Sequence, residues 1–442
     1  MSTLTERLVD FVCDSPTAFH AAAAIARELE AAGARRIDER DEWRIEPGEL
    51  RYVERSGSAI LAVRAGMRPP RETGFALACA HTDSPALKAR IEKPLPGKGG
   101  ERVAVEIYGG PIVSSWLDRP LALAGRLVLR GKGGALESRL FASKGPVGVV
   151  PDLAIHLNRE INKGFEYNPQ SQLPVLVAAP TKAGAQAEER RETSWAIGLV
   201  AKELAVDPKA ILGADLYFTD AQGPVLLGDD DELVNGPRLD DLLGCHAILE
   251  AFLAAPAADH WQVACFLDNE EVGSRTPQGA DSAFLRDVLE RLSSVSGTGE
   301  DRYRALASSF CVSVDVAQAF HPSYADKFDD YYAPVLNGGP AVKASANFRY
   351  ATDAESEARF RLLCSEAGVS CQKFLSRADI APGTTIGPLG SSLTGIATVD
   401  VGAPLLSMHA MRETAGLRDH EAMIAALGAF FRLGPATGAR GR

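Results

Sequence analysis

The sequence predicts an α/β fold, in which one α/β domain with a mixed central sheet flanked by helices is interrupted by an inserted β-rich domain. Three observations support this prediction. The chain has 442 residues, 46% of them hydrophobic, which is enough to build substantial cores in two or three domains. Strand-like and helix-like segments alternate in residues 1–91 and again in 231–442. Between them, residues 92–230 read as β hairpins.

The amino-terminal segment predicts two helices. Apolar residues from Leu4 to Val12 fall on one helical face. Residues 14–16, Asp-Ser-Pro, then have the pattern of a helix start with proline at the first helical position. The second helix is expected to end near Gly33.

Several apolar runs are too short for helices and predict buried strands. Because these runs are continuously apolar, both faces of each strand should be covered, as in a parallel sheet. The runs are FALACA at 75–80, WQVACFL at 261–267, SSFCVSV at 308–314 and IATVDV at 396–401.

The predicted insertion differs from the flanking segments in its hydrophobic pattern, which is that of β hairpins. Val103, Val105 and Ile107 recur at every second position, which is the alternation of a strand. The segment LALAGRLVLR is followed by a GKGG turn and by ALESRLFAS, which is the pattern of a hairpin.

Charge and cysteine usage limit the classes of partner. A formal net charge of −11 disfavours nucleic acid and anionic membranes as main partners, because both would be repelled. The seven cysteines are odd in number, have no C-x-x-C spacing and mostly lie in apolar runs, so we expect reduced, buried thiols. The first residues do not form a signal peptide and no segment has the length of a membrane span, so the cytosol is the expected compartment.

Groups that can bind metal follow four of the apolar runs. Each has a plain structural reading, as a hydrogen-bonded histidine or a solvated acidic residue. In open α/β sheets, however, ligands bind beyond the carboxyl ends of the strands, so these groups should converge. Carboxylates next to apolar runs also need a cation or a hydrogen-bond network to compensate them. The groups are His81-Thr82-Asp83, Asp268-Asn269-Glu270-Glu271, Asp315 and His409.

Spacing adds detail within these motifs. His81 and Asp83 point to one side of an extended backbone, so Asp83 can hold the imidazole. Glu270 and Glu271 diverge, so that one can bind metal while the other acts as general base. Asp240 lies near the start of a helical segment, where it either caps the helix or joins the site.

Competing motifs are absent from the sequence. The segment starting at His420 lacks the second histidine of H-E-x-x-H, and neither a P-loop nor a G-x-S-x-G elbow occurs. Three other histidines on helical segments are expected to be structural, namely His20, His246 and His260.

Motifs spread over nearly the whole chain resemble those of the aspartyl aminopeptidases, a family of dinuclear metallopeptidases. They occur in the family's order: FVCDSPTAFHA, AHTDSPALKAR, LAIHLNR, PRLDDLLGC, DNEEVGS, FRYATD, GTTIGP and VDVGAPLLSMHAMRE. The resemblance implies a catalytic α/β domain in 1–91 and 231–442, and a β-rich dimerisation domain in 92–230. It also implies a large tetrahedral homo-oligomer built from dimers.

The resemblance assigns metal ligands residue by residue. His81 and Asp315 would bind one divalent metal, Glu271 and His409 the other, and Asp240 would bridge both. Zinc is expected, although such ligands also accept manganese or cobalt. The metals would lower the pKa of a shared water from its value in bulk water toward about 7. Glu270, as general base, would take its proton as hydroxide attacks the peptide carbonyl, and would then protonate the leaving amine.

The resemblance also implies two substrate-binding residues for small peptides with an acidic amino-terminal residue. His156 would enter a neighbouring subunit's active site and assist the substrate carbonyl, whereas its pattern alone indicates a strand histidine. Lys343 would help to accept the acidic side chain, whereas sequence alone favours an exposed loop lysine.

Two departures from the family pattern bear on specificity rather than on metal binding. Leu239-Asp240-Asp241 replaces the usual Leu-Asp-Asn, and Ala317-Gln318-Ala319 replaces Ala-His-Ala. Two alternative functions remain at this point: a related dinuclear carboxypeptidase or amidase, and a cage-forming scaffold without catalysis.

Overall fold

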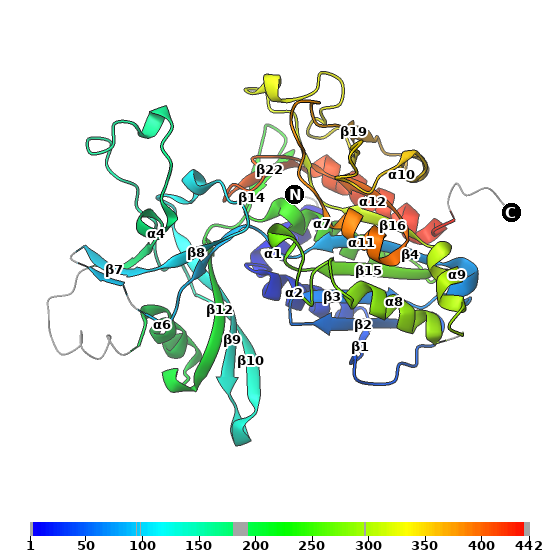
Figure 1. Cartoon of the computed structure of the whole chain (residues 1–442), viewed down its shortest axis with the longest axis horizontal. Coiled ribbons are helices and arrows are strands. Elements are labelled where there is room, and N and C mark those ends of the chain that lie inside the picture. The colour runs from blue at the N-terminus through cyan, green and yellow to red at the C-terminus, as the bar shows by residue number, and fades with distance from the viewer. Residues whose placement is uncertain (1–2, 94, 98, 180–192, 296–297, 437–442) are drawn as a thin grey trace. The chain divides into compact units, whose positions relative to one another are not determined.

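The structure is a computed structural model that describes residues 3–93, 95–97, 99–179, 193–295 and 298–436 (Figure 1). It divides into two compact units. The first comprises Met1–Asp83, Pro224–Met408 and Glu413–Arg442, and the second comprises Ser84–Gly223 and His409–Arg412. The inserted segment of the second unit therefore starts at residue 84 and ends at 223, where the sequence analysis placed the insertion at 92–230.

A nine-stranded sheet forms the centre of the first unit, in the order β1-β2-β3-β15-β4-β16-β20-β18-β19. The four apolar runs form β15, β4, β16 and β20, which are neighbours and parallel, as predicted. β3 and β18 run antiparallel to them, so the sheet is mixed. The strands are β1 (Arg35–Arg36), β2 (Leu50–Arg55), β3 (Ala59–Arg64), β4 (Phe75–His81), β15 (Trp261–Leu267), β16 (Phe310–Val314), β18 (Ala341–Lys343), β19 (Gln372–Phe374) and β20 (Ala397–Gly402).

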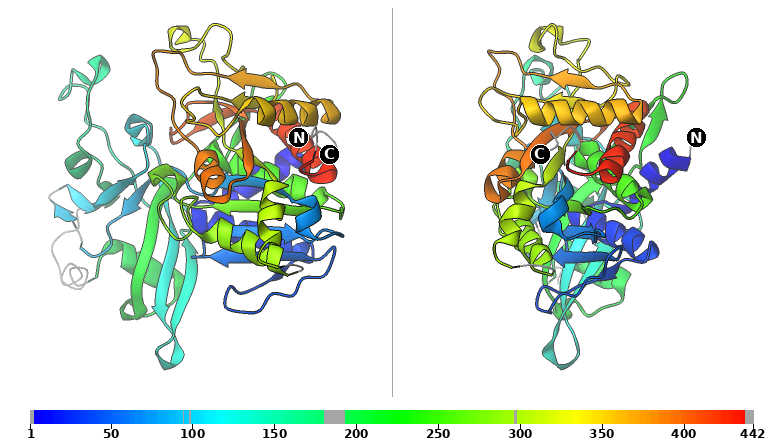
Figure 2. Two further views of the ribbon diagram at one scale, coloured as in Figure 1. Left: turned by 45° about the vertical axis from the view of Figure 1, so that its right-hand side comes forward. Right: turned by 90° about the vertical axis from the view of Figure 1, so that its right-hand side faces the viewer.

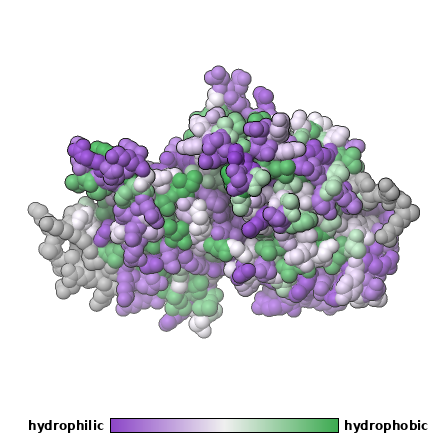
Figure 3. All heavy atoms as spheres, turned by 45° about the horizontal axis from the view of Figure 1, so that its top comes forward, coloured by the Kyte–Doolittle hydropathy of each residue, from purple (hydrophilic) through white to green (hydrophobic). Residues whose placement is uncertain are grey.

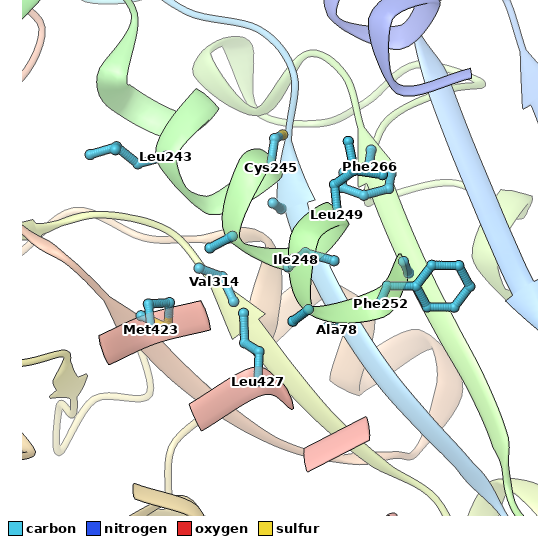
Figure 4. Packing of buried hydrophobic residues seen from close by; sticks show 14 of the residues in the cluster. Ala78, Leu243, Cys245, Ile248, Leu249, Phe252, Phe266, Val314, Met423 and Leu427 are labelled. Atoms are coloured by element: carbon cyan, nitrogen blue, oxygen red, sulfur yellow. The ribbon is translucent and has the colours of Figure 1, made fainter. Parts of the chain in front are cut away.

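Helices cover both faces of this sheet (Figure 2). Side chains of β4 alternate between two hydrophobic cores, with Ala78 in one and Leu77 in the other, as strand geometry requires. Figure 4 shows α7 and α12 side chains packed in the first core. The helices that contribute side chains to the first core are α1 (Thr3–Asp14), α2 (Ala18–Ala31), α7 (Leu239–Ala254), α10 (Ala354–Ala367) and α12 (Leu417–Leu433). Those that contribute to the second core are α8 (Phe284–Ser294), α9 (Asp301–Ala307) and α11 (Ile386–Thr394). A short helix, α3 (Pro70–Thr73), precedes β4.

The start of α2 differs from the prediction. Pro16 is not the first helical residue, because Thr17 has the extended backbone of an N-cap and the helix begins at Ala18. The Thr17 hydroxyl lies 2.9 Å from Nδ1 of His20, which gives that histidine the structural role expected for it. The helix ends at Ala31, close to the predicted position.

A smaller five-stranded sheet in the first unit has the order β13-β14-β22-β21-β17. β14 and β22 are antiparallel, and Gly236 is paired with Glu413. The strands are β13 (Val225–Leu227), β14 (Leu233–Gly236), β17 (Ala317–Gln318), β21 (Pro404–Leu406) and β22 (Glu413–Gly416).

The second unit is β-rich, with a five-stranded sheet β10-β9-β12-β5-β8 and a three-stranded sheet β11-β7-β6. The predicted hairpin is confirmed, since β9 and β10 pair antiparallel across a turn in which Gly133 and Gly134 have positive φ. The elements are β5 (Ala86–Ala89), β6 (Leu95–Gly97), β7 (Gly100–Val103), β8 (Val105–Tyr108), β9 (Leu121–Arg130), β10 (Leu136–Ala142), β11 (Val175–Ala178), β12 (Ile211–Asp220), α4 (Pro169–Gln172) and α6 (Trp195–Leu204). Short 3-10 helices of the chain are η1 (Val113–Trp116), η2 (Lys132–Gly134), η3 (Ile161–Lys163), η4 (Pro208–Ala210), η5 (Glu270–Val272) and η6 (Ala325–Lys327).

All seven cysteines are free thiols. Five are buried, as predicted, but Cys13 is exposed on α1 and Cys371 is partly exposed. Within the described residues, we find no helix with the length and apolar character needed to cross a membrane.

Two buried histidines join α7 and α12. Nδ1 of His246 lies 2.9 Å from Nε2 of His420, so the two rings share a hydrogen bond. Burial lowers the pKa of both, that of His420 from 6.5 to about 4. Both side chains are therefore neutral at pH 7, in agreement with the structural role expected of His246.

This pair predicts a loss of stability in acid. In the unfolded chain His420 becomes protonated below pH 6.5, whereas in the native state it stays neutral down to about pH 4. The free energy of unfolding therefore falls as the pH is lowered from 6.5 to 4. A shift of this size corresponds to about 3 kcal/mol. We expect the free energy of unfolding of His420→Gln, relative to that of wild type, to rise by roughly that amount between pH 7.5 and pH 4. Urea unfolding of both proteins in metal-free form measures the difference. Parallel pH curves would contradict the prediction.

Candidate metal centre

The predicted ligands of the first unit do come together at the carboxyl ends of neighbouring parallel strands. β4 ends at His81, and Asp315 directly follows β16. The ligand atoms of His81, Asp240 and Asp315 all lie within 4.8 Å of one another, and so do those of His81, Glu270 and Glu271. Two overlapping groups of possible metal ligands therefore share one imidazole.

The first group is deeply buried. Nε2 of His81 is 3.2 Å from Oδ1 of Asp240 and 3.9 Å from Oδ1 of Asp315. Burial would lower the pKa of His81, but hydrogen bonds to the Asp240 and Asp83 carboxylates raise it well above its ordinary value. Burial raises the pKa of Asp315, the Lys343 ammonium opposes the shift, and the Asp240 carboxylate adds to it. A cation among these groups would offset the repulsion between the Asp240 and Asp315 carboxylates.

Asp83 contacts His81 through its main chain as well as through its carboxylate. Nδ1 of His81 lies 3.0 Å from the main-chain oxygen of Asp83 and 3.5 Å from its carboxylate. The two carboxylate oxygens accept the main-chain N–H groups of Glu270 and Glu271, at 3.0 and 3.1 Å. The main chain of Asp83 therefore orients the imidazole, while its side chain fixes the turn that carries both glutamates. With Nδ1 occupied, Nε2 is the nitrogen directed at a metal.

The sequence left open whether Asp240 caps the helix α7 or belongs to the metal site. In the structure the two aspartates at the start of α7 share these roles. Asp240 and Asp241 have non-helical backbone angles, so the regular helix starts after them. Oδ1 of Asp241 accepts the N–H of Gly244 at 3.1 Å, which is helix capping. Asp240 points its carboxylate at His81 instead. Burial raises the pKa of Asp241 well above its ordinary value, with the His81 imidazole opposing the shift.

Glu270 and Glu271 occupy a tight turn after β15. Asn269 adopts φ 62°, in the left-handed region that asparagine tolerates, and its side-chain oxygen accepts hydrogen bonds from Thr276 and Gln278. This role of Asn269 is not among the predictions from the sequence, although an asparagine between acidic residues is a signal for such a turn. Burial raises the pKa of Glu270 to about 7, with the His81 imidazole opposing the shift. A carboxylate with this pKa suits a general base at neutral pH.

Lys343 is not an exposed loop residue, so that reading is wrong. It ends β18, is 3% exposed, and its ammonium lies 3.0 Å from the oxygen of Val316 and 3.2 Å from Oδ2 of Asp315. Burial alone would lower the pKa of Lys343, but the Asp315 carboxylate holds it above its ordinary value. The lysine is therefore a permanent cation beside a predicted metal ligand.

His156 and His409 belong to the second unit. Nδ1 of His409 lies 3.1 Å from the main-chain oxygen of Gly110, which leaves Nε2 as the nitrogen suited to a metal. His156 is an exposed residue in a turn, so the strand reading of its sequence pattern is wrong. Leu153, Ile155 and Leu157 around it are 52%, 48% and 75% exposed. The face drawn in Figure 3 mixes hydrophobic and hydrophilic residues.

Two further buried carboxylates escaped the sequence analysis. Asp400 of β20 is fully buried and accepts hydrogen bonds from Thr385 and from the N–H of Ala351. Its signal was a charged residue within the apolar run IATVDV. Glu413, 1% exposed, accepts the main-chain N–H of Asp240 at 2.9 Å, and nothing local in the sequence indicates this contact.

The donor set of the first unit fits a divalent metal such as zinc. It combines one imidazole nitrogen, oriented by a hydrogen bond at its other nitrogen, with several carboxylates in a buried space. Negative groups so close together would repel one another strongly unless a cation compensates them.

Comparison with known proteins agrees with this chemistry. A family model described as aminopeptidase I zinc metalloprotease (M18) matches residues 11–431. A probable M18 family aminopeptidase 2 of Pseudomonas aeruginosa (strain UCBPP-PA14) is 44% identical over 430 residues, which cover 97% of this chain and 98% of the relative. Its counterpart in Azotobacter vinelandii (strain DJ / ATCC BAA-1303) is 41% identical over 429 residues, with the same coverage.

Solved structures show the same fold. The protein in a cryo-EM structure of the Ape4 and Nbr1 complex has a TM-score of 0.93 and 31% identity, covering 97% of this chain and 85% of that one. The S. cerevisiae mApe1 dodecamer gives a TM-score of 0.84 and 28% identity, covering 97% and 96%. The chain therefore belongs to the aminopeptidase I zinc metalloprotease (M18) family and is a zinc-dependent aminopeptidase, as its resemblance to the aspartyl aminopeptidases implied.

Proposed function

We propose that the chain is a dinuclear aminopeptidase that removes acidic residues from the amino termini of peptides. In this proposal His81 and Asp315 bind one metal, Glu271 and His409 bind the other, and Asp240 bridges both. The observation that carries it is the convergence of His81, Asp240, Asp315 and both glutamates at one sheet edge. The two ions, when bound, would lower the pKa of a shared water and polarise the peptide carbonyl.

The residues of the chain supply the proton transfers. Glu270, whose pKa is about 7, accepts the proton of the attacking water and passes it to the leaving amine. The Asp83 carboxylate keeps Glu270 in place by accepting the main-chain N–H of Glu270, and the main-chain oxygen of Asp83 keeps His81 in the correct tautomer. These contacts support catalysis by a pre-organised base.

Chain connectivity supports His409 as a ligand. β21 of the first unit ends at Leu406, and His409 follows three residues later. Its Nδ1 contact with Gly110 also gives it the tautomer of a ligand.

Lys343 and His156 are the proposed substrate-binding residues. The buried Lys343 ammonium supplies positive charge that would favour an acidic side chain, although Asp315 and Val316 already engage it. His156, exposed among apolar side chains, is placed on a surface suited to contact with a second subunit.

We propose that the second unit forms this dimer contact and that dimers assemble into a tetrahedral homo-oligomer. The mApe1 relative is a dodecamer. The free thiols fit the reducing cytosol expected from the sequence.

A substrate panel tests the specificity. We expect aminoacyl p-nitroanilides of Asp and Glu to be cleaved with higher kcat/KM than those of Ala and Leu, and acetyl-Asp p-nitroanilide not to be cleaved, because an aminopeptidase needs a free α-amino group. Cleavage of Leu but not of Asp or Glu would refute the acidic preference. Activity that instead needs a free α-carboxylate would favour the carboxypeptidase alternative.

A further inference from the structure

Glu413 is a buried carboxylate with no role in the mechanism so far. It starts β22 in the first unit and is 1% exposed. Charged side chains are almost never buried to this degree without a specific partner. One such partner is the main-chain N–H of Asp240, which donates to Oε2 of Glu413 at 2.9 Å.

The N–H of Asp240 needs a partner outside the helix. Asp240 has φ −82° and ψ 106°, which are extended rather than helical angles, although it stands at the start of α7. Arg238, two residues before Asp240, adopts φ 57° in the left-handed region, so the backbone is also irregular there. The N–H of Asp240 is therefore not part of the regular helical ladder, and the conformation depends on other contacts.

The strand pairing fixes where Glu413 can reach. Glu413 is paired with Gly236 on β14, four residues before Asp240. The main-chain oxygen of Glu413 also accepts a hydrogen bond from Nδ2 of Asn235 at 3.1 Å. The backbone of Glu413 is thus anchored on β14, and its side chain spans the turn that leads to Asp240.

We propose that Glu413 is the positioning residue of the bridging ligand, and that it sets the direction of the Asp240 carboxylate by holding its main-chain N–H. This inference rests on the proposed function, in which Asp240 bridges two metals. The Asp240 carboxylate lies 3.2 Å from Nε2 of His81, so a rotation of the Asp240 backbone would move it away from the shared position. Partners that orient metal ligands typically contribute about 10–100-fold to metal affinity or activity.

Two conservative variants separate the hydrogen bond from the charge. Glu413→Gln removes the charge but keeps an oxygen at the same reach, and the N–H of Asp240 selects that oxygen. Glu413→Asp keeps the charge but withdraws the acceptor by about 1.5 Å, the length of one C–C bond. We expect Glu413→Asp to lose zinc at a chelator concentration about 10–100-fold lower than wild type does, and to have a lower kcat with little change in KM. Glu413→Gln should retain most of the zinc affinity and most of the kcat of wild type.

Thr414→Val is the matched control. Thr414 neighbours Glu413 on β22 and accepts a hydrogen bond from the same Asn235 at 3.0 Å, so the variant removes a side-chain contact between β22 and β14. We expect this variant to lower the thermal midpoint without changing zinc retention or kcat. Equal losses of zinc in Thr414→Val and Glu413→Asp would show that Glu413 serves only the sheet, and would overturn the inference.

The remaining outcomes are also decisive. A Glu413→Asp variant that keeps zinc and kcat, or a Glu413→Gln variant that loses as much as Glu413→Asp, overturns the hydrogen-bond role while leaving the metal site standing. A wild-type protein that retains no zinc and cleaves no amino-terminal residue overturns the proposed function, and this inference with it.

Discussion

Replacement of Glu270 by glutamine is expected to lower kcat by a factor on the order of 10²–10⁴ while leaving the bound metal unchanged. The reason is that Glu270 carries the proton from water to the leaving amine, whereas the carboxylate of Glu271 binds metal. Glutamine matches the shape of glutamate and preserves the N–H donated to Asp83 at 3.0 Å, so the turn should keep its conformation. Steady-state kinetics with Asp p-nitroanilide, together with elemental analysis, measure both quantities.

The control for this variant is Glu421→Gln, at an exposed glutamate of α12, which should behave as wild type. The pH profile adds a second readout. With the pKa of Glu270 raised to about 7 by burial, protonation of the base should reduce wild-type kcat/KM toward acid pH, and bound cations would move this limb lower. A Glu270→Gln enzyme with wild-type kcat would exclude Glu270 as the base.

Replacement of Asp240 by asparagine is expected to have a comparably large effect through the metals. Asp240 is 3% exposed, and its Oδ1 lies 3.2 Å from Nε2 of His81. The ligand atoms of Asp240 and Asp315 lie within 4.8 Å of each other. Removing its charge takes away the proposed bridge, so we expect zinc affinity to fall by more than about 100-fold, beyond the usual loss for residues that merely orient ligands. Activity at limiting zinc should fall with it.

Thermal unfolding measures this loss without reference to activity. A ligand that binds only the native state stabilises it by about 4 kcal/mol at 1,000 times its dissociation constant. Zinc added to metal-free wild type should therefore raise the thermal midpoint by several degrees, and the midpoint of Asp240→Asn should barely move. Asp10→Asn, at an exposed position on α1, is the matched control. An equal zinc-induced shift in Asp240→Asn and wild type would remove Asp240 from the site.

Much of the fold and half of the site could be predicted because their signals are local. An apolar run such as WQVACFL marks a strand with both faces covered, and the residue after such a strand lies at the sheet edge where ligands bind. These two rules place His81, Asp315 and the Glu270-Glu271 pair near one another. The start of α2 was misplaced because both Pro16 and Thr17 are acceptable at a helix start, and backbone geometry decided between them.

The remainder depends on contacts between distant segments. Glu413 reaches Asp240 only because β22 pairs with β14, and Lys343 is buried only because β18 adds to the edge of β20. No pattern near either residue encodes that pairing. The spacing of His81 and Asp83 predicts their contact, but not that the Asp83 carboxylate also accepts the N–H groups of Glu270 and Glu271 in the turn after β15.

The most direct test of the dinuclear centre is a zinc titration of chelator-treated protein, read by elemental analysis and by isothermal titration calorimetry in two buffers. The account predicts two zinc ions per chain. It also predicts proton release on binding, because the pKa of metal-free His81 is held high by its hydrogen bonds to Asp240 and Asp83 and a histidine ligand must be neutral. A single zinc per chain, or none, would contradict the paired site.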